Sequence, residues 1–321
     1  MRAHALSVLL VTALPACYSG SEPRTVATPG LSNRATTVPS HYSATIADPL
    51  GFLPIDAELV VGLDVRQIRG SGLWQRYLVP RLGKYSGGLE QFKRACKIDP
   101  IAAITHITLA GRSLDGGHPD VVMVIHGLSR TRFMDCARRD IAVVNQRAHL
   151  VGDVIEIAAK PDEVDREAMQ FVGPETAVMI AGPTADKQRL ANVLASGSPL
   201  RGSPGFAPLF ERVAIDESMW LILNGNTKAL SGAASLGFRP RALYGSIALG
   251  DGVAITLRVR LDQPADAARL VTAAQSGLAT VKPMVDDLAI TADDSEAVFA
   301  VTISDAKLQA LLGTLGSLTT P

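Results

Sequence analysis

The sequence lacks an excess of charge of either sign. It contains 31 basic and 31 acidic residues among 321, so its formal net charge is zero near neutral pH. A protein that binds nucleic acid needs a basic surface to neutralise phosphate groups. A balanced composition supplies no such field, and we therefore predict that nucleic acid is not a partner.

Aromatic residues are scarce, at 5% of the chain. Surfaces that bind single-stranded nucleic acid depend on exposed aromatic rings for stacking. The larger rings here fall in periodic apolar segments, which predicts core packing instead. These residues are Trp74, Tyr77, Phe92, Trp220 and Phe238.

Motifs that carry catalysis or cofactor binding are also missing. The sequence has no phosphate-binding loop, no dinucleotide-binding glycine motif and no G-x-S-x-G nucleophile elbow. It has no H-E-x-x-H and no C-x-x-C pattern either. We therefore predict no catalytic residue, no cofactor and no metal ligand, and we interpret the protein as non-enzymatic.

Two groups of residues come closest to a metal site. His106 and His126 lie in neighbouring predicted strands and could meet across a hairpin, where they would be either metal ligands or structural side chains. No third ligand has a recognisable spacing, which favours the structural interpretation. Acid pairs at 286–287 and 293–294 flank a short predicted strand without the alternation of a calcium loop, so we expect exposed turn residues.

A long apolar run is absent from the body, but the first residues form a short one. Arg2 precedes an apolar segment at residues 5–13, which is shorter than the roughly 20 residues needed to span a bilayer. A basic start followed by a short apolar core is typical of a signal peptide. The segment ends in Leu14-Pro15-Ala16-Cys17.

This ending resembles the lipobox of bacterial lipoproteins, with Leu at −3, a small residue at −1 and Cys at +1; Pro15 departs from the usual −2 residue. The resemblance implies that residues 1–16 are removed and that Cys17 is lipidated. The alternative is an ordinary secretory signal with a nearby cysteine. Tyr18 stands where Asp often marks inner-membrane retention, so the resemblance favours the outer membrane.

Only two cysteines, Cys96 and Cys136, remain for the body. An exported protein reaches a compartment that permits disulfides. A bridge between them would close a loop of about 40 residues and contribute about 4 kcal/mol on the chain-entropy model. Two reduced, buried cysteines are the alternative.

The chain divides into an export segment, a tether and a body. Residues 17–50 are rich in Ser, Thr, Pro and Gly and predict a flexible tether behind the lipid. We place a first module at 51–173 and a second at 174–321, whose segment 174–213 either completes the first sheet or bridges the two. Both modules have the order strand, helix, hairpin, helix, two strands, helix, which indicates either a duplication or a chance similarity.

Hairpins mixed with helices predict the α+β class, with antiparallel sheets and helices packed on one face. The Gly250-Asp251-Gly252 turn predicts a hairpin, and Pro264 opens a predicted helix. We also expect strands at 142–145 and 154–159, and helices at 162–171 and 227–235.

The body is similar to uncharacterised envelope lipoproteins of high-GC Gram-negative bacteria, through the Val60-Val-Gly-Leu-Asp64 strand and the Ser203-Pro-Gly-Phe206 segment. The resemblance implies no activity. The leading hypothesis is a membrane-anchored binding, scaffold or accessory module, whose partners are the membrane, through its lipid, and an envelope protein. A periplasmic hydrolase with a dispersed site and a carrier of an apolar ligand are the alternatives, the carrier because hydrophobic residues make up 47% of the chain.

Overall fold

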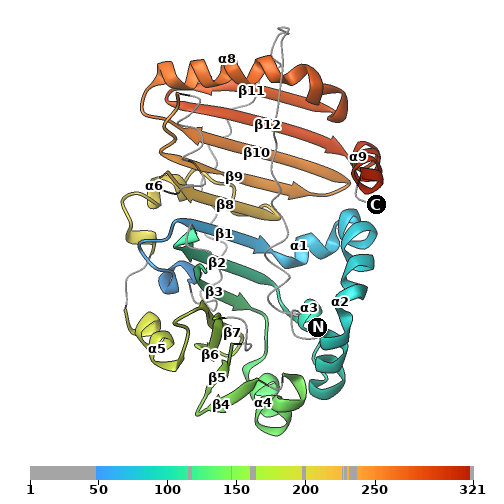
Figure 1. Cartoon of the computed structure of the whole chain (residues 1–321), viewed down its shortest axis with the longest axis vertical. Coiled ribbons are helices and arrows are strands. Elements are labelled where there is room, and N and C mark those ends of the chain that lie inside the picture. Colours follow the sequence, from blue (N-terminus) through green and yellow to red (C-terminus); the bar gives the residue numbers. More distant parts are fainter. Residues whose placement is uncertain are drawn as a thin grey trace.

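The computed structural model describes residues 48–114, 118–145, 147–159, 164–196, 200–225, 227, 230 and 237–318. Its strands form a single antiparallel sheet in the order β11-β12-β10-β9-β8-β1-β2-β3-β7-β6-β5-β4 (Figure 1). The strands are β1 (Leu59–Asp64), β2 (His106–Arg112), β3 (Asp120–His126), β4 (Ala148–Val151), β5 (Val154–Ile157), β6 (Arg166–Phe171), β7 (Thr176–Gly182), β8 (Met219–Asn224), β9 (Ala242–Leu249), β10 (Gly252–Arg260), β11 (Asp287–Asp293) and β12 (Glu296–Ser304).

The two halves of the sheet meet where β1 pairs with β8, from Leu59 opposite Leu223 to Leu63 opposite Met219. On one side of this seam the order is β8-β9-β10-β12-β11, and on the other it is β1-β2-β3-β7-β6-β5-β4. Outward from the seam, β1, β2, β3, β5 and β4 take the places that β8, β9, β10, β12 and β11 take on the other side. The β6–β7 hairpin is inserted between β3 and β5. The segment 174–213 therefore contributes β7 to the first half of the sheet.

The seam is packed around one glycine. The indole of Trp220 on β8 lies across Gly62 on β1, and a Cβ atom at Gly62 would stand 2.1 Å from the indole nitrogen. Trp220 is 3% exposed and packs edge-on against Phe210, with ring centroids 5.4 Å apart. Close contact of the two halves therefore requires glycine at position 62, because glycine has no side chain to displace the indole.

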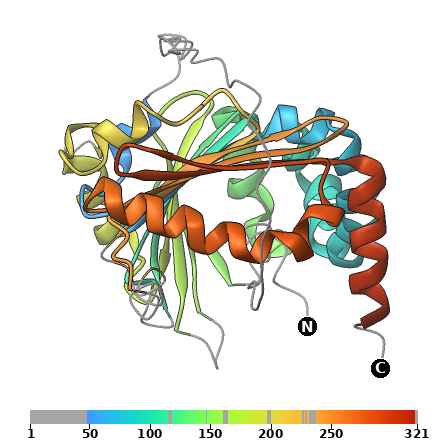
Figure 2. The same ribbon diagram turned by 90° about the horizontal axis from the view of Figure 1, so that it is seen from above.

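Side chains alternate between two faces, which we call face A and face B. Face A carries Val60, Trp220 and Tyr244 and is covered by η2 (Pro49–Phe52), α5 (Lys187–Ala195), η5 (Leu200–Gly202) and α6 (Ala207–Phe210). Face B is covered near its two ends, by α4 (Arg130–Val144) over the β5–β7 strands and by α8 (Pro264–Val281) over β11 and β12. Helices thus lie on both faces of one continuous sheet (Figure 2).

The remaining helices gather at the end of the sheet where β1 finishes. They are α1 (Val65–Gly70), the π-helical η3 (Trp74–Leu78), α2 (Val79–Cys96), α3 (Pro100–Ala103), η7 (Lys282–Met284) and α9 (Asp305–Leu318). An ion pair between Arg76 and Asp305 joins η3 to α9, so segments from both halves lie side by side there (Figures 1 and 2). A disulfide links Cys96 at the end of α2 to Cys136 on α4, with Cα atoms 5.1 Å apart.

The α+β class and the antiparallel arrangement are confirmed, as are the hairpin of β9 and β10 and the helix that Pro264 opens. The helices, however, lie on both faces of the sheet and not on one as expected, since apolar side chains point to both faces. Two local predictions are also wrong. Residues 142–144 belong to α4, because a helix already begun at Arg130 extends through β-branched residues at a cost of only tenths of a kcal/mol each.

The second error is the helix at 162–171, since 166–171 form β6. Glu167, Ala168 and Met169 are good helix formers, but β6 pairs with both β5 and β7, and this pairing outweighs local propensity. Most of the helix expected at 227–235 lies outside the described residues.

We predict that Gly62→Ala destabilises the protein by about 1–3 kcal/mol, because the methyl group forces the Trp220 ring off the seam. Denaturant unfolding monitored by tryptophan fluorescence measures the change. Gly72→Ala is the matched control, since a Cβ there meets nothing within 4 Å and its φ is not positive. Equal midpoints for the two variants would contradict the packing described for the seam.

Candidate functional site

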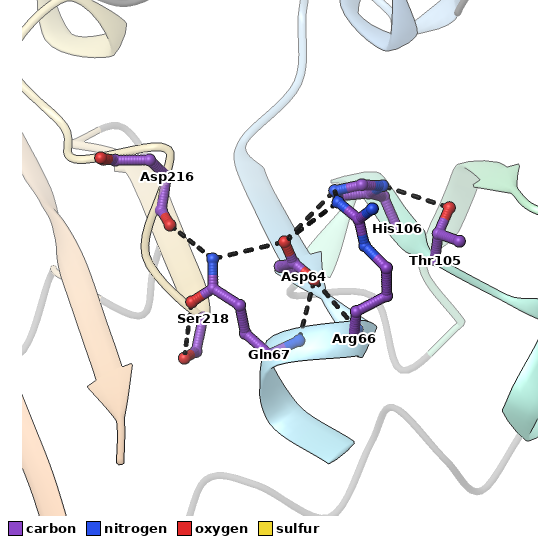
Figure 3. A network of polar contacts seen from close by, with 7 residues as sticks. All are labelled: Asp64, Arg66, Gln67, Thr105, His106, Asp216 and Ser218. Carbon is purple, nitrogen blue, oxygen red and sulfur yellow. Dashed lines mark hydrogen bonds and ion pairs between the residues drawn. The ribbon is translucent and has the colours of Figure 1, made fainter. Parts of the chain in front are cut away.

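A network of polar side chains lies at the end of the seam, where β1 passes into α1 (Figure 3). Asp64 caps α1 by accepting from the backbone N–H groups of Arg66 and Gln67, at 2.9 and 3.0 Å. The same carboxylate lies 3.3 Å from Nε2 of His106, which is also 3.2 Å from a guanidinium nitrogen of Arg66.

The network reaches the second half of the sheet through Gln67. Its amide donates to the carbonyl of Asp216 at 2.7 Å, and the hydroxyl of Ser218 donates to its carbonyl oxygen at 3.3 Å. Ser218 also accepts from the backbone N–H of Leu249, at 3.0 Å. The network therefore ties α1, β8 and β9 together.

Serine, histidine and aspartate side chains are all present here, but their hydrogen bonds are not those of a hydrolase triad. A nucleophile must bond to its base. Ser218 is 1% exposed as a residue and bonds to Gln67, whereas the ring of His106 bonds to Asp64, Arg66 and Thr105. This arrangement is suited to holding the two halves together, and within the described ranges no base bonds to the serine.

His106 and His126 do meet across the β2–β3 hairpin, as expected. They are directly opposite in the register, with ring centroids 6.5 Å apart. His126 is 3% exposed; its Nδ1 lies 3.1 Å from the hydroxyl of Thr176, and its Nε2 has no partner in the described part of the chain. Burial lowers the pKa of His126 to about 4, and burial also lowers the pKa of His106.

No group of three or more His, Cys, Asp or Glu side chains positioned to hold a metal occurs among the described residues. The two acid pairs at the ends of β11 are exposed at all four positions. Asp286 accepts from the backbone N–H of Ser304 and lies 3.4 Å from Lys307, and the backbone hydrogen bond lowers the pKa of Asp286 most.

An ionic cluster around the buried Glu296 on face A was not predicted from the sequence. Glu296 on β12 is 1% exposed and accepts from the hydroxyl of Tyr244 at 2.6 Å, from Arg212 at 2.7 Å and from Arg258 at 3.2 Å. Arg258 also donates to Asp293 at 2.9 Å. Burial raises the pKa of Tyr244, as does the bond to Glu296, so the phenol stays protonated. The carboxylate is paired and hydrogen-bonded, which is what a buried charge requires.

The most unusual surface is on face B, over the central strands. Among the aliphatic side chains that point to this face are twelve on β1, β8, β9 and β10, which we call the aliphatic floor. They are Leu59, Val61 and Leu63 on β1; Met219, Leu221 and Leu223 on β8; Leu243, Ile247 and Leu249 on β9; and Val253, Ile255 and Leu257 on β10.

All twelve side chains of the floor are half-buried. The described helices of face B pack at either end, α4 on the cluster around Met169 and Met179 and α8 on the cluster around Ile290. The floor residues belong to none of the described core clusters. The floor is therefore a wide aliphatic surface set between helical walls.

The structure places few of the residues singled out from sequence in one site. Cys17 lies outside the described residues, and Cys96 and Cys136 form their disulfide beside α4. The aliphatic floor was missed because a strand with apolar residues at successive positions is read as buried on both faces. No single-sequence signal distinguishes the face that the described helices cover from the part of the other face that they leave uncovered.

Comparison with known proteins yields fold relatives only. No family model and no curated protein matches the chain. Solved structures of TP0453 from Treponema are similar: crystal form III has a TM-score of 0.53 at 12% identity, covering 84% of this chain and 99% of that one. Crystal form I has a TM-score of 0.51 at 13% identity, covering 84% and 98%. At this identity the likeness defines the fold and carries no activity.

Within the described ranges, no helix is both long enough and apolar enough to cross a bilayer.

The buried histidine predicts a specific pH dependence of stability. Because the pKa of His126 is about 4 in the folded chain and ordinarily 6.5, only the unfolded chain binds the proton between these values. The contribution of His126 to the free energy of unfolding is therefore greatest above pH 6.5, and it decreases by about 3 kcal/mol as pH falls towards 4.

Denaturant unfolding at pH 7.5 and pH 4.5 measures this loss. In the His126→Gln variant, the free energy of unfolding should change less between the two pH values. The exposed His149, changed to Gln, serves as the control and should leave the pH dependence unchanged. A wild-type dependence in the His126 variant would contradict the assignment.

Proposed function

We propose that the chain is an exported lipoprotein of the cell envelope, anchored through a lipid on Cys17. The support is the basic start, the short apolar core and the Leu14-Pro15-Ala16-Cys17 ending. Several acyl chains on one residue give lasting attachment, since each buried methylene contributes about 0.8 kcal/mol. Tyr18 favours the outer membrane, and the tether lets the body work in the periplasm or at the cell surface.

The body is, on this proposal, a non-enzymatic binding module, and the observation that supports this is the aliphatic floor. An apolar sheet surface that the described helices leave uncovered is a candidate binding site. Its side chains are aliphatic and recessed between helical walls, which suits flexible acyl chains better than a flat protein partner. The carrier alternative thus has a specific observation in its favour: we propose that the floor binds the acyl chains of a lipid.

The hydrolase alternative has less support. Among the described residues, no base bonds to Ser218 in the polar network of Figure 3, and the acid Glu296 is fully paired. Neither group adjoins the aliphatic floor, because Asp64, His106 and Glu296 all lie on face A. The side chains that could do acid–base chemistry are therefore on the opposite face from the proposed ligand.

The anchor is tested by labelling with a fatty-acid analogue in cells. We expect the wild-type chain to incorporate the label and to sediment with membranes, because the lipobox directs acylation of Cys17. Cys17→Ala should lose the label entirely, whereas Cys96→Ser should keep it. Equal labelling of wild type and Cys17→Ala would refute the anchor.

The floor is tested by extracting bound lipid from the mature chain, residues 17–321 with Cys17→Ala, exported on a cleavable secretory signal and purified without detergent. Mass spectrometry should detect acyl-chain lipids. Leu221→Asp places a charge in the middle of the floor and should remove most of the lipid, since a desolvated charge costs several kcal/mol.

Thr256→Asp is the matched control, because Thr256 is an exposed residue of β10 on face A. It should retain the bound lipid. If extracts of all three proteins contained the same lipid, or if the chain without either change contained none, the floor would not be a lipid site.

A further inference from the structure

Face A carries a separate cavity, on the side of the sheet opposite the aliphatic floor. It has a volume of about 330 Å³ and lies between residues 200–209 and the strands β1, β8, β9 and β10. This volume is at the low end of the range for small-molecule sites, about 300–1,000 Å³. The space fits a small molecule better than the acyl chains of a whole lipid.

The lining of the cavity combines an apolar wall with a few charged groups. Apolar side chains on it include Val60, Ile222, Phe206 and Leu261. The charged groups on it are Glu58, Arg241 and Arg260. Such a lining suits a ligand that has an apolar body and one charged end.

The charged groups differ in how fully they are paired. Glu58 accepts the backbone N–H groups of Ser113 and Leu114, both at 3.1 Å, so its two oxygens are occupied. Arg241 donates to Asp262 from a largely exposed side chain. Among the described residues, Arg260 is paired with Glu296, at 3.8 Å. Tyr244, Arg212 and Arg258 lie closer to that carboxylate.

The cluster around Glu296 contains more positive than negative charges, which leaves one guanidinium available to a ligand. It contains the guanidinium groups of Arg212, Arg258 and Arg260 and the carboxylates of Glu296 and Asp293. Three positive and two negative charges leave one positive charge, and Arg260 is the member of the cluster that lines the cavity. A guanidinium presents a planar pair of donors that matches a carboxylate.

We propose that this cavity binds a small organic acid, with its carboxylate on Arg260, its apolar body against Val60, Ile222 and Leu261, and Arg241 at the rim. A monoanion is favoured over a dianion because the surplus is a single charge and Glu58 lies on the same lining. The site is independent of the lipid site proposed on face B.

Octanoate is the probe, and calorimetric titration of the mature chain described above is the measurement. Octanoate should bind, while octan-1-ol and octylammonium should bind at least tenfold more weakly, since a charged hydrogen bond contributes enough for that factor. Arg260→Gln should weaken octanoate binding at least tenfold. Arg239→Gln, an exposed arginine outside the lining, should leave it unchanged.

Leu221→Asp separates the two sites, because it alters the floor and leaves the cavity intact. Octanoate binding that survives Leu221→Asp and fails in Arg260→Gln supports the cavity. Loss of octanoate binding in Leu221→Asp with retention in Arg260→Gln would overturn the inference in favour of the floor. Equal binding of octanoate and octylammonium to the unmodified chain would also overturn it, and this comparison does not depend on the folding of any variant.

Discussion

The pairing of β1 with β8 is the interaction on which the rest of the structure depends. It joins two sets of strands into one sheet, and it requires Gly62 because the Trp220 indole occupies the space of a side chain there. The backbone N–H of Asp64 donates to the carbonyl of Ser218 at 2.9 Å and extends the contact past the last paired residues. If the halves were separated, neither the aliphatic floor nor the cavity would exist, since both include β1 and β8.

This continuity explains why the described helices leave the middle of face B uncovered. A sheet with helices at both ends of face B is long enough for α4 and α8 to stand apart, and the strands between them keep aliphatic side chains that no described helix covers. The polar groups are placed elsewhere. Asp64, His106, Tyr244 and Glu296 all lie on face A, where hydrogen bonds and ion pairs satisfy most of them. The sheet therefore separates an apolar side from a side rich in buried polar contacts.

Sequence reasoning predicted the local elements better than their assembly. The Gly250-Asp251-Gly252 turn and the proline at the start of α8 identified their elements, because turn and cap chemistry is local. The meeting of His106 with His126 followed from a short hairpin. The fusion of two sheets could not be read from the chain, because edge pairing between β1 and β8 joins residues far apart in sequence. Glu296 was missed for the same reason, since its arginine and tyrosine partners come from distant segments.

The direct test of the central claim, that face B is an acyl-chain site created by the joined sheet, is photocrosslinking with a phospholipid that carries a photoreactive group on its acyl chain. The account predicts labelled peptides from β1, β8, β9 and β10, at floor residues such as Leu221 and Ile255. Labels confined to α5 and α6 on face A, or no label above that of an irradiated control lacking lipid, would contradict it.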